Sequence, residues 1–512
     1  MSSATTTAAD PQTAYHELIG RAREQSILAS CSALLGWDEQ TYMPRLGSEH
    51  RCEQLALLAG IHHERATDPR IGELLGQLEG SELTSDPTAP SAVNIRELKR
   101  TYERLTRLPR TLVEELARVT SRAHPEWVEA RRDQDFSRLQ PTLETIVRLK
   151  REEASCLGSA SGDPYDALLD EYEPGSRAAD LATLFAALRR ELVPLVSGIA
   201  GSSRQPDTTI LHRDYPVDRQ RMFAEAAAAA LGFNFEAGRL DTTAHPFCTG
   251  IGPGDTRITT RFDARNFSDA FFGVLHEVGH GLYDQGLDPA HHGTPMGEAV
   301  SLGVHESQSR LWENVVGRSW AFWSYWFPLA RQVFRDALTG VSFDAFYFAI
   351  NEVKPSLIRV QADEVTYNLH ILVRFELERA LLNNDLDVAD LPGAWNEAYT
   401  RYLGVTPANV SEGCLQDIHW SAGLFGYFPT YTLGNLFAAQ LFEKATQDLG
   451  DLPAAIERGD YSTLLDWLRS RIHRHGQTYR SADLIERVTG SRPGHEPLMK
   501  ALHAKYGALY GL

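Results

Sequence analysis

The sequence predicts a mostly α-helical protein that carries one small β-sheet. Three observations lead to this fold class. Apolar residues recur at intervals of three and four through residues 12–200, which is the period of an amphipathic helix. A convincing strand pattern, Thr-rich and alternating, occurs only in residues 239–244 and 256–263. Helical spacing then returns at residue 266 and continues to the C-terminus.

The first 200 residues predict a series of helices behind a short tail. Residues 1–10 are small and polar, and we expect them to be disordered. Residues 81–91, rich in Ser, Thr and Pro, predict a loop between helices. We expect Trp37 to anchor the core and Asp38 to cap a helix, although Trp37-Asp38-Glu39 could instead face a cleft.

The middle of the chain contains the predicted sheet. A second loop is expected at residues 201–209, and the alanine-rich helix 224–231 should end at Gly232. A Gly- and Pro-rich stretch at 250–254 separates the two predicted strands. An exposed edge of such a sheet can pair with an extended peptide. From residue 266 onward the helical pattern is interrupted at Pro328, Pro355, Pro392, Pro407 and Pro429.

Composition excludes several classes of protein. The net charge of −18 argues against a nucleic-acid or anionic-membrane partner. The five cysteines are scattered and lack C-x-x-C spacing, which argues against a disulfide framework or a thiolate metal site. The sequence has neither a secretory signal pattern nor a run of the ~18 apolar residues that a membrane span requires. We therefore expect a cytoplasmic protein, with residues 11–512 forming a single domain.

Residues 271–280, FFGVLHEVGH, carry the strongest chemical signal. His276 and His280 are four residues apart, so on a helix both imidazoles project from one face and can bind one metal ion, usually zinc. Glu277 lies beside this pair, where a carboxylate can take a proton from water activated by the ion. Gly279 is a poor helix former, and its presence suggests that another element packs closely against the helix.

Two histidines do not complete a catalytic zinc site, which uses three protein ligands and keeps one position for water. The third ligand should be a carboxylate from the following helix, and the candidates are Glu298, Glu306 and Glu313. Spacing alone does not decide between them. Two histidines and a carboxylate suit Co²⁺ or Mn²⁺ as well as Zn²⁺, and we expect one ion per chain.

Several further segments accompany this motif in a fixed order: H-P-F at 245–247, D-T-R-I-T at 255–259, H-E-S-Q at 305–308, I-R-V-Q-A-D-E-V-T-Y-N-L-H at 358–370, Q-D-I-H-W at 416–420 and G-Y-F-P-T-Y at 426–431. With these motifs the chain resembles the carboxypeptidase Taq family of zinc metallocarboxypeptidases. The resemblance extends from the region of Trp37 to the C-terminus.

The resemblance implies a large helical body divided by a deep groove, with the small sheet beside the active-site helix, similar to neurolysin and the angiotensin-converting peptidases. Residues 11–200 would supply mainly the groove wall and lid helices, and residues 201–512 the catalytic half. It also implies a homodimer. Among the open candidates it implies Glu306 as the third metal ligand, which makes Glu298 a neighbouring carboxylate.

The activity implied by the resemblance is release of single amino acids from the C-terminus of peptides, with broad preference and poor tolerance of proline near the cut. The ion would lower the pKa of its water toward ~7, and Glu277 would pass the proton to the leaving amine. His419 and Tyr431 match the His and Tyr of the similar peptidases and are candidate donors to the oxyanion, with Tyr427 a close rival.

Recognition of a free C-terminal carboxylate is best done by a guanidinium group. Arg359 is the first candidate because it opens a motif, and Arg257 is the second. Either residue could instead pair with a structural carboxylate. The resemblance further implies that His245 and the group Asp255, Arg257 and Thr259 shape the closed end of the groove.

Two other functions remain open from the sequence. An oligoendopeptidase similar to neurolysin would still cleave peptides whose C-terminus is amidated. A non-catalytic peptide-binding protein stabilised by zinc would close its site with a fourth protein ligand. The presence of Glu277 argues against this last alternative, because a structural site has no use for an unligated carboxylate there.

Overall fold

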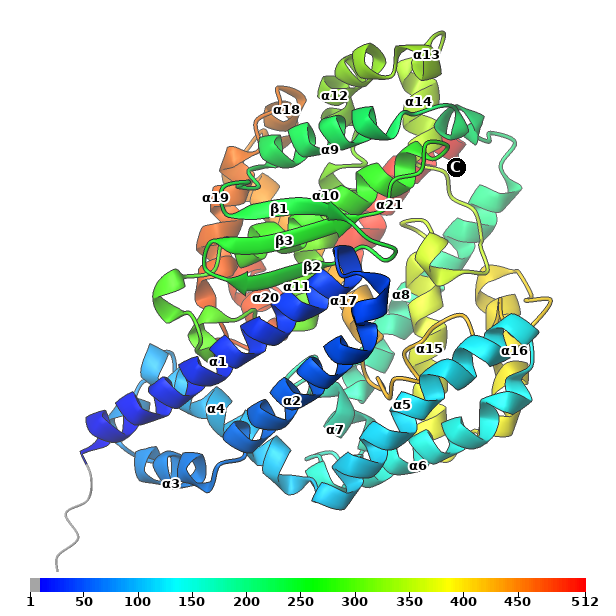
Figure 1. Ribbon diagram of the computed structural model, residues 1–512. Helices are drawn as coiled ribbons and strands as arrows, with labels where there is room; N and C mark the ends of the chain where they lie inside the picture. The colour runs from blue at the N-terminus through cyan, green and yellow to red at the C-terminus, as the bar shows by residue number, and fades with distance from the viewer. Residues whose placement is uncertain (1–9) are drawn as a thin grey trace, which may run out of the picture.

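The computed structural model describes residues 10–512 and is mostly helical, as the sequence predicts (Figure 1). The helices before the sheet are α1 (Pro11–Thr41), α2 (Ser48–Ala66), α3 (Pro69–Leu78), α4 (Pro90–Arg107), α5 (Arg110–Asp133), α6 (Gln140–Leu157), α7 (Pro164–Leu169), α8 (Ala178–Gly201) and α9 (Val217–Leu231). Those after it are α10 (Phe267–Asp284), α11 (Leu302–Arg310), α12 (Trp320–Val333), α13 (Arg335–Leu338), α14 (Phe343–Ile350), α15 (Tyr367–Leu382), α16 (Leu391–Leu403), α17 (Pro429–Leu449), α18 (Leu452–Glu457), α19 (Ser462–Arg471), α20 (Ser481–Thr489) and α21 (Glu496–Tyr510).

The sheet has three strands, β1 (Gly238–Thr242), β2 (Cys248–Gly252) and β3 (Asp255–Thr260), in the order β1-β3-β2. β1 runs parallel to β3, and β2 runs antiparallel to it. The sequence prediction missed β2, which overlaps the glycine-rich stretch expected to separate two strands. Gly254, at φ +83°, lies in the tight turn that returns the chain from β2 to β3. The pairing across this turn makes β2 a strand despite its weak strand propensity.

The start of α1 is capped as helices commonly are, because the Asp10 side chain accepts a hydrogen bond from the Gln12 N–H. The rest of the predicted disordered tail lies outside the described residues. Trp37 is buried, as expected of a core residue. The prediction that Asp38 caps a helix is wrong, because α1 continues to Thr41 and the Asp38 carboxylate pairs with Arg51 of α2 at 2.7 Å.

Two of the predicted interruptions in the C-terminal half coincide with helix starts, since Pro392 and Pro429 lie in the first turns of α16 and α17. The break predicted at Pro328 is wrong, because this residue lies inside α12. The helical prediction also fails for residues 404–428, which form turns, bends and irregular segments. Among residues 10–512, none of the helices combines the length and apolar character that a membrane crossing demands.

Apolar side chains gather in two separate cores. The large core draws on residues from Leu112 to Tyr510 and includes the buried faces of α10, α11, α15 and α17. A small core joins α1, α3 and α4, and consists of Ala14, Leu18, Ile71, Leu74, Leu75, Leu78 and Ile95. The helices around the small core are called the N-terminal unit below.

A polar joint attaches the N-terminal unit to the main body. Glu97 of α4 is only 1% exposed, and its carboxylate accepts hydrogen bonds from Arg96, Arg100 and Arg480 at 2.6, 3.1 and 2.8 Å. Arg480 directly precedes α20 in the C-terminal part of the chain. A charge buried in this way is stable only because it is paired on several sides.

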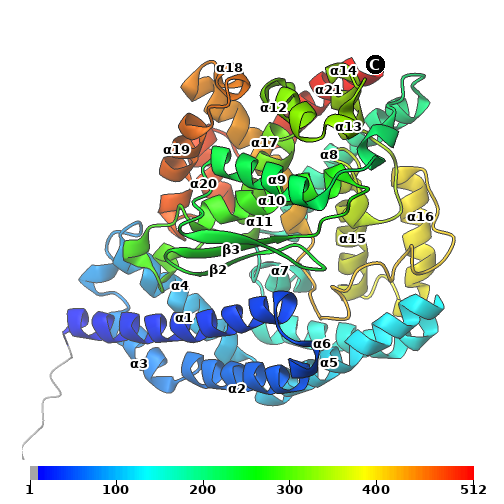
Figure 2. The same ribbon diagram turned by 45° about the horizontal axis from the view of Figure 1, so that its top comes forward.

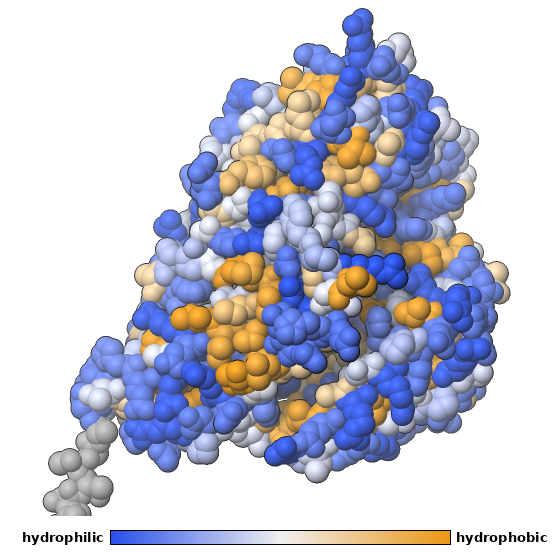
Figure 3. Space-filling view, viewed as in Figure 1, coloured by the Kyte–Doolittle hydropathy of each residue, from blue (hydrophilic) through white to orange (hydrophobic). Residues whose placement is uncertain are grey.

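The arrangement of the layers positions α10, the helix that carries His276 and His280 and is called the metal helix below. α10 packs against β3 and β2, and α1 lies along β2 on the other side (Figures 1 and 2). Figure 2 shows α1 and α2 as a layer below the sheet. The space-filling view shows this face hollowed between the α1–α2 pair and α5 (Figure 3). A helical body with a small sheet beside the metal helix is therefore confirmed, whereas the division into wall and catalytic halves stays a prediction.

Candidate active site

α10 forms where the sequence predicts it. Asn266 is its N-cap, and the Asn266 side chain accepts a hydrogen bond from the Asp269 N–H at 3.2 Å. The apolar residues of this helix recur at helical spacing and are fully or almost fully buried; they include Phe267, Phe271, Val274, Leu275, Val278 and Leu282. Their burial against the large core fixes the rotation of α10, so the opposite stripe carries the histidines.

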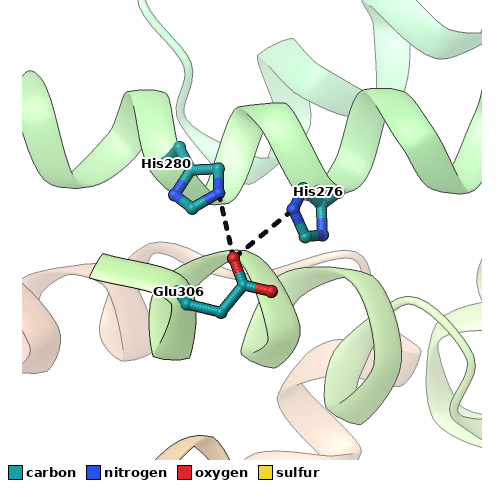
Figure 4. Close-up of side chains that lie close together, drawn as sticks. All are labelled: His276, His280 and Glu306. Atoms are coloured by element: carbon teal, nitrogen blue, oxygen red, sulfur yellow. Dashed lines mark ion pairs between the residues drawn. The ribbon is translucent and has the colours of Figure 1, made fainter. Parts of the chain in front are cut away.

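The structure brings the three predicted metal ligands together (Figure 4). Nε2 of His276 and Nε2 of His280 lie 3.7 and 3.3 Å from the same oxygen, Oε2 of Glu306. The three ligand atoms lie within 4.8 Å of one another. Across residues 10–512, this is the one group of His, Cys, Asp and Glu side chains that clusters so closely. Glu298 and Glu313, the other carboxylates that spacing left open, are not part of it.

Close contact between α10 and α11 makes this convergence possible. A Cβ atom on Gly279 would lie 2.5 Å from the carbonyl oxygen of Gln308 and from the Cα atom of Ser309. The absence of a side chain at Gly279 therefore lets the α11 backbone lie directly against α10. The predicted close packing at this glycine is confirmed.

Arg310, which the sequence prediction missed, and Glu313, which it offered only as a possible third ligand, hold the ligands in place. Glu313 Oε2 lies 2.8 Å from Nδ1 of His276, a hydrogen bond that the ring nitrogen donates. Arg310 donates from Nε to Oε1 of Glu306 at 2.7 Å and leaves Oε2 directed at the histidines. Arg310 and Glu313 follow Glu306 by four and seven residues, so helical periodicity from that ligand was the available signal.

The protonation states of His280 and Glu306 suit a cation. Burial and the neighbouring His305 lower the pKa of His280 to about 4, so its imidazole is neutral at physiological pH. Burial would raise the pKa of Glu306, but Arg310 and His276 outweigh it, and the pKa lies well below the ordinary range. Burial lowers the pKa of His276, but the charges of Glu306 and Glu313 outweigh it and raise the value to about 9, so this imidazole gives up a proton when a cation binds. Two neutral imidazoles and an ionised carboxylate then fit a zinc-type site.

Glu277 lies next to the ligands but outside the cluster. It is 6% exposed, and burial raises its pKa from 4.5 to about 7. A carboxylate with this pKa can both accept and release a proton near neutral pH. This pKa is consistent with the predicted role of Glu277 as a general base.

His419, Tyr427 and Tyr431 form a second group near the metal cluster. Nε2 of His419 lies 3.4 Å from the Tyr431 hydroxyl, and the ring of Tyr427 lies 5.4 Å from that of His419, centroid to centroid. Burial and the charge of Glu306 raise the pKa of Tyr427, so its hydroxyl keeps its proton. Burial does the same for Tyr431. Both phenols can therefore donate a hydrogen bond.

Arg359 is buried and already paired with a structural carboxylate, one of the alternatives left open by the sequence. Its Nε and Nη2 donate to Oδ1 of Asp417 at 3.0 and 2.8 Å, and its Nη1 donates to the Tyr367 hydroxyl at 2.9 Å. Arg374 pairs with the other oxygen of Asp417. Asp417 is thus held between two guanidinium groups.

The remaining predicted substrate-binding residues lie in and next to the sheet. Arg257 of β3 pairs with Asp255 at 2.7 Å, and its guanidinium lies 4.2 Å from the ring of Trp37 on α1. Thr259 is fully buried, and its hydroxyl bonds the backbone of Phe247. His245 is exposed in the connection between β1 and β2, two residues before Phe247. Thr259 therefore holds the connection that carries His245.

Comparison with known proteins agrees with this geometry. Residues 17–506 match the family model described as carboxypeptidase Taq (M32) metallopeptidase. Thermostable carboxypeptidase 1 of Thermus thermophilus is 53% identical over 98% of this chain and the whole of that relative. Carboxypeptidase 1 of Bacillus subtilis is 39% identical over 93% of this chain and 95% of that relative.

Solved structures give the same result. The M32 carboxypeptidase from Deinococcus radiodurans R1 aligns with a TM-score of 0.94 and 41% identity, over 98% of this chain and all of that one. Carboxypeptidase Apo-Mg from Pyrococcus furiosus aligns with a TM-score of 0.92 and 34% identity, over 96% of this chain and 99% of that one. This chain therefore belongs to the carboxypeptidase Taq (M32) family and is a metal-dependent carboxypeptidase.

Proposed function

We propose that the enzyme binds one Zn²⁺ ion through His276, His280 and Glu306 and releases single amino acids from the C-terminus of peptides with broad preference. The observation that carries this proposal is the convergence of three ligand atoms from two helices, with Glu277 beside them. Co²⁺ and Mn²⁺ suit the same ligands and are the alternatives to zinc.

In this mechanism Glu277 is the general base and then the general acid. The bound ion supplies Lewis-acid activation of the water and of the scissile carbonyl. Glu277 takes a proton from the attacking water and delivers it to the leaving amine. Its pKa of about 7 supports both steps near neutral pH. His419 and Tyr431, or Tyr427 in place of Tyr431, donate hydrogen bonds to the oxyanion.

The substrate extends along the sheet and ends at a guanidinium group. Among residues 10–512 β2 pairs with β3 alone, so an extended peptide can add to its other edge as a further strand. Arg359 anchors the C-terminal carboxylate of the substrate, which takes the place of the Tyr367 hydroxyl as the acceptor from Nη1. Arg257 is the second candidate. His245, together with the β3 residues, bounds the closed end of the groove.

Substitution of the base tests the mechanism. Glu277→Gln should retain its metal and lose about 10²–10⁴-fold in turnover, the usual contribution of a general base. Glu378→Gln is the matched control, because burial also raises the pKa of Glu378 to about 7 but its partners are Tyr165, Trp420 and the Gly426 N–H, and none of these is a predicted metal ligand. Metal content and release of the terminal amino acid from an N-blocked dipeptide are measured together. Near-normal turnover of Glu277→Gln would remove it from this role.

Peptide amides distinguish the carboxypeptidase from the oligoendopeptidase alternative. We expect cleavage of a free-acid peptide and none of its C-terminal amide, whereas an endopeptidase would cut both. Arg359→Ala should weaken cleavage of the free acid specifically. If acid and amide were affected equally by this substitution, the anchor assignment would fail. A non-catalytic peptide-binding protein would cleave neither peptide.

We also propose that the enzyme is a cytoplasmic homodimer that acts on peptides and binds neither nucleic acid nor membranes. The family resemblance supports the dimer, and the net charge of −18 supports the absence of anionic partners. Sedimentation velocity of the metal-loaded enzyme tests the dimer, and a monomer at micromolar concentration would contradict it.

A further inference from the structure

The two histidine ligands are held in different ways. His276 donates a hydrogen bond from Nδ1 to Glu313 at 2.8 Å. Nδ1 of His280 is buried and finds no hydrogen-bond partner among the described residues. A histidine that binds a metal ion usually donates its second ring nitrogen to an oxygen acceptor, which fixes the orientation of the ring. The ring of His280 must therefore be fixed by another kind of contact.

His305, on α11, supplies that contact. Its ring lies against the ring of His280 with the centroids 4.5 Å apart and the planes 18° from parallel. Nε2 of His305 also lies 3.0 Å from Oδ1 of Asp284, one helical turn after His280 on α10. His305 thus bridges two successive turns of the helix that carries the histidine ligands. We propose that His305 is a positioning residue, whose stacked ring sets the plane of His280 and aims its Nε2 at the metal position.

The neighbouring residue on α11 completes the support. Glu306, directly after His305, has Oε2 at 3.3 Å from Nε2 of His280. One residue of α11 therefore contacts the face of the His280 ring, and the next contacts its edge. Both contacts depend on the close approach of the two helices at Gly279.

The stack continues behind His305 and keeps it from moving away. The ring of Tyr283 lies 5.3 Å from that of His305, and the ring of His473 lies 4.8 Å from that of Tyr283. Nε2 of His473 is hydrogen-bonded to the Gln308 side chain at 2.9 Å, which returns the row of rings to α11. The Tyr283 hydroxyl accepts from the backbone N–H of Val300 at 3.2 Å. This row of rings therefore limits movement of His305 away from His280.

A pair of substitutions separates stacking from hydrogen bonding. His305→Phe keeps a planar ring, His305→Leu keeps only the bulk, and both lose the bond to Asp284. The dissociation constants for Zn²⁺ and Co²⁺ are measured by chelator competition, and the absorption spectrum of the Co²⁺ form reports the ligand geometry. We expect His305→Leu to bind both ions about 10–100-fold more weakly, which is the usual effect of removing a residue that orients a metal-binding side chain. His305→Phe should stay close to the wild-type affinity and spectrum.

His495→Leu is the matched control. Nε2 of His495 also contacts a carboxylate, Glu191, at 2.8 Å, but its ring supports no metal ligand. The His495→Leu variant should bind Zn²⁺ and Co²⁺ with the affinity of the wild type. Unchanged affinity in His305→Leu, or equal weakening in the Leu and Phe variants, would overturn the stacking role. If His305→Leu does not fold, His305→Phe decides alone, since a tenfold weaker affinity or an altered cobalt spectrum contradicts the proposal.

Discussion

Replacing Glu173 by Gln should make the enzyme less sensitive to alkaline unfolding. Glu173 is 0% exposed in the segment between α7 and α8. It accepts a hydrogen bond from the Gly303 N–H at the start of α11, the helix that carries Glu306, and from the Ser481 hydroxyl at 3.0 Å. Burial raises its pKa from 4.5 to about 7. Glu173→Gln retains the acceptor oxygen and removes the charge.

The raised pKa of Glu173 determines how the stability of the folded protein changes with pH. A carboxyl with a raised pKa holds in the folded protein a proton that the unfolded chain releases, so stability falls as pH rises from 4.5 to about 7 and stays lower above it. At 1.36 kcal/mol per pKa unit the loss is about 3 kcal/mol. For a cooperative chain of 512 residues, with an unfolding entropy of about 2.1 cal/mol/K per residue, this corresponds to about 3 °C in Tm.

Calorimetry of the chelator-treated protein at about pH 5 and about pH 9 measures this difference without a contribution from metal binding. The wild type should lose about 3 °C more than Glu173→Gln between the two conditions. Glu171→Gln is the control, because Glu171 is exposed and lies only two residues away. If Glu173→Gln and the wild type lost the same number of degrees, the pKa of Glu173 would be the same in the folded and unfolded protein, and burial would not raise it.

Two further substitutions test the packing around the site. Gly434→Ala would place a Cβ atom 2.5 Å from Cγ of Glu306. We expect a loss of about 1–3 kcal/mol in stability, measured by thermal unfolding, and weaker metal binding, measured by chelator competition. Unchanged metal affinity would mean that Glu306 can shift without consequence. Asp417→Asn removes the negative charge that lies between the buried Arg359 and Arg374. It should destabilise the protein by up to about 3–5 kcal/mol, measured by denaturant unfolding. A change below about 1 kcal/mol would show that water or other groups compensate the guanidinium charges.

The metal helix could be predicted because its chemistry is local. The four-residue separation of His276 and His280 needs only helical geometry, and the surrounding apolar residues supply it. The third ligand is not local, because it depends on how α11 packs on α10. Spacing therefore left Glu298, Glu306 and Glu313 open, and only the family resemblance selected among them. The closeness of the three ligand atoms agrees with that selection.

The errors have a common physical origin, since tertiary contacts outweighed local propensity. β2 is glycine-rich, yet its pairing with β3 makes it a strand. Pro328 remains inside α12 because burial of Trp323 and Phe327 on that helix outweighs the roughly 3 kcal/mol penalty of an interior proline. The commitment of Arg359 to Asp417 also depends on a partner 58 residues away and is invisible in the sequence motif.

The separate small core of the N-terminal unit determines how that part of the enzyme can open. Because α1, α3 and α4 bury their apolar side chains against one another, swinging the unit outward exposes little of the large core. Polar contacts also resist such a swing, and they include the pair of Arg480 with Glu97 and the bonds of Arg96 to the carbonyls of Gln477 and Thr478. Contacts of that kind can be exchanged for water one at a time, and so we expect the N-terminal unit to move without unfolding α10 and α11.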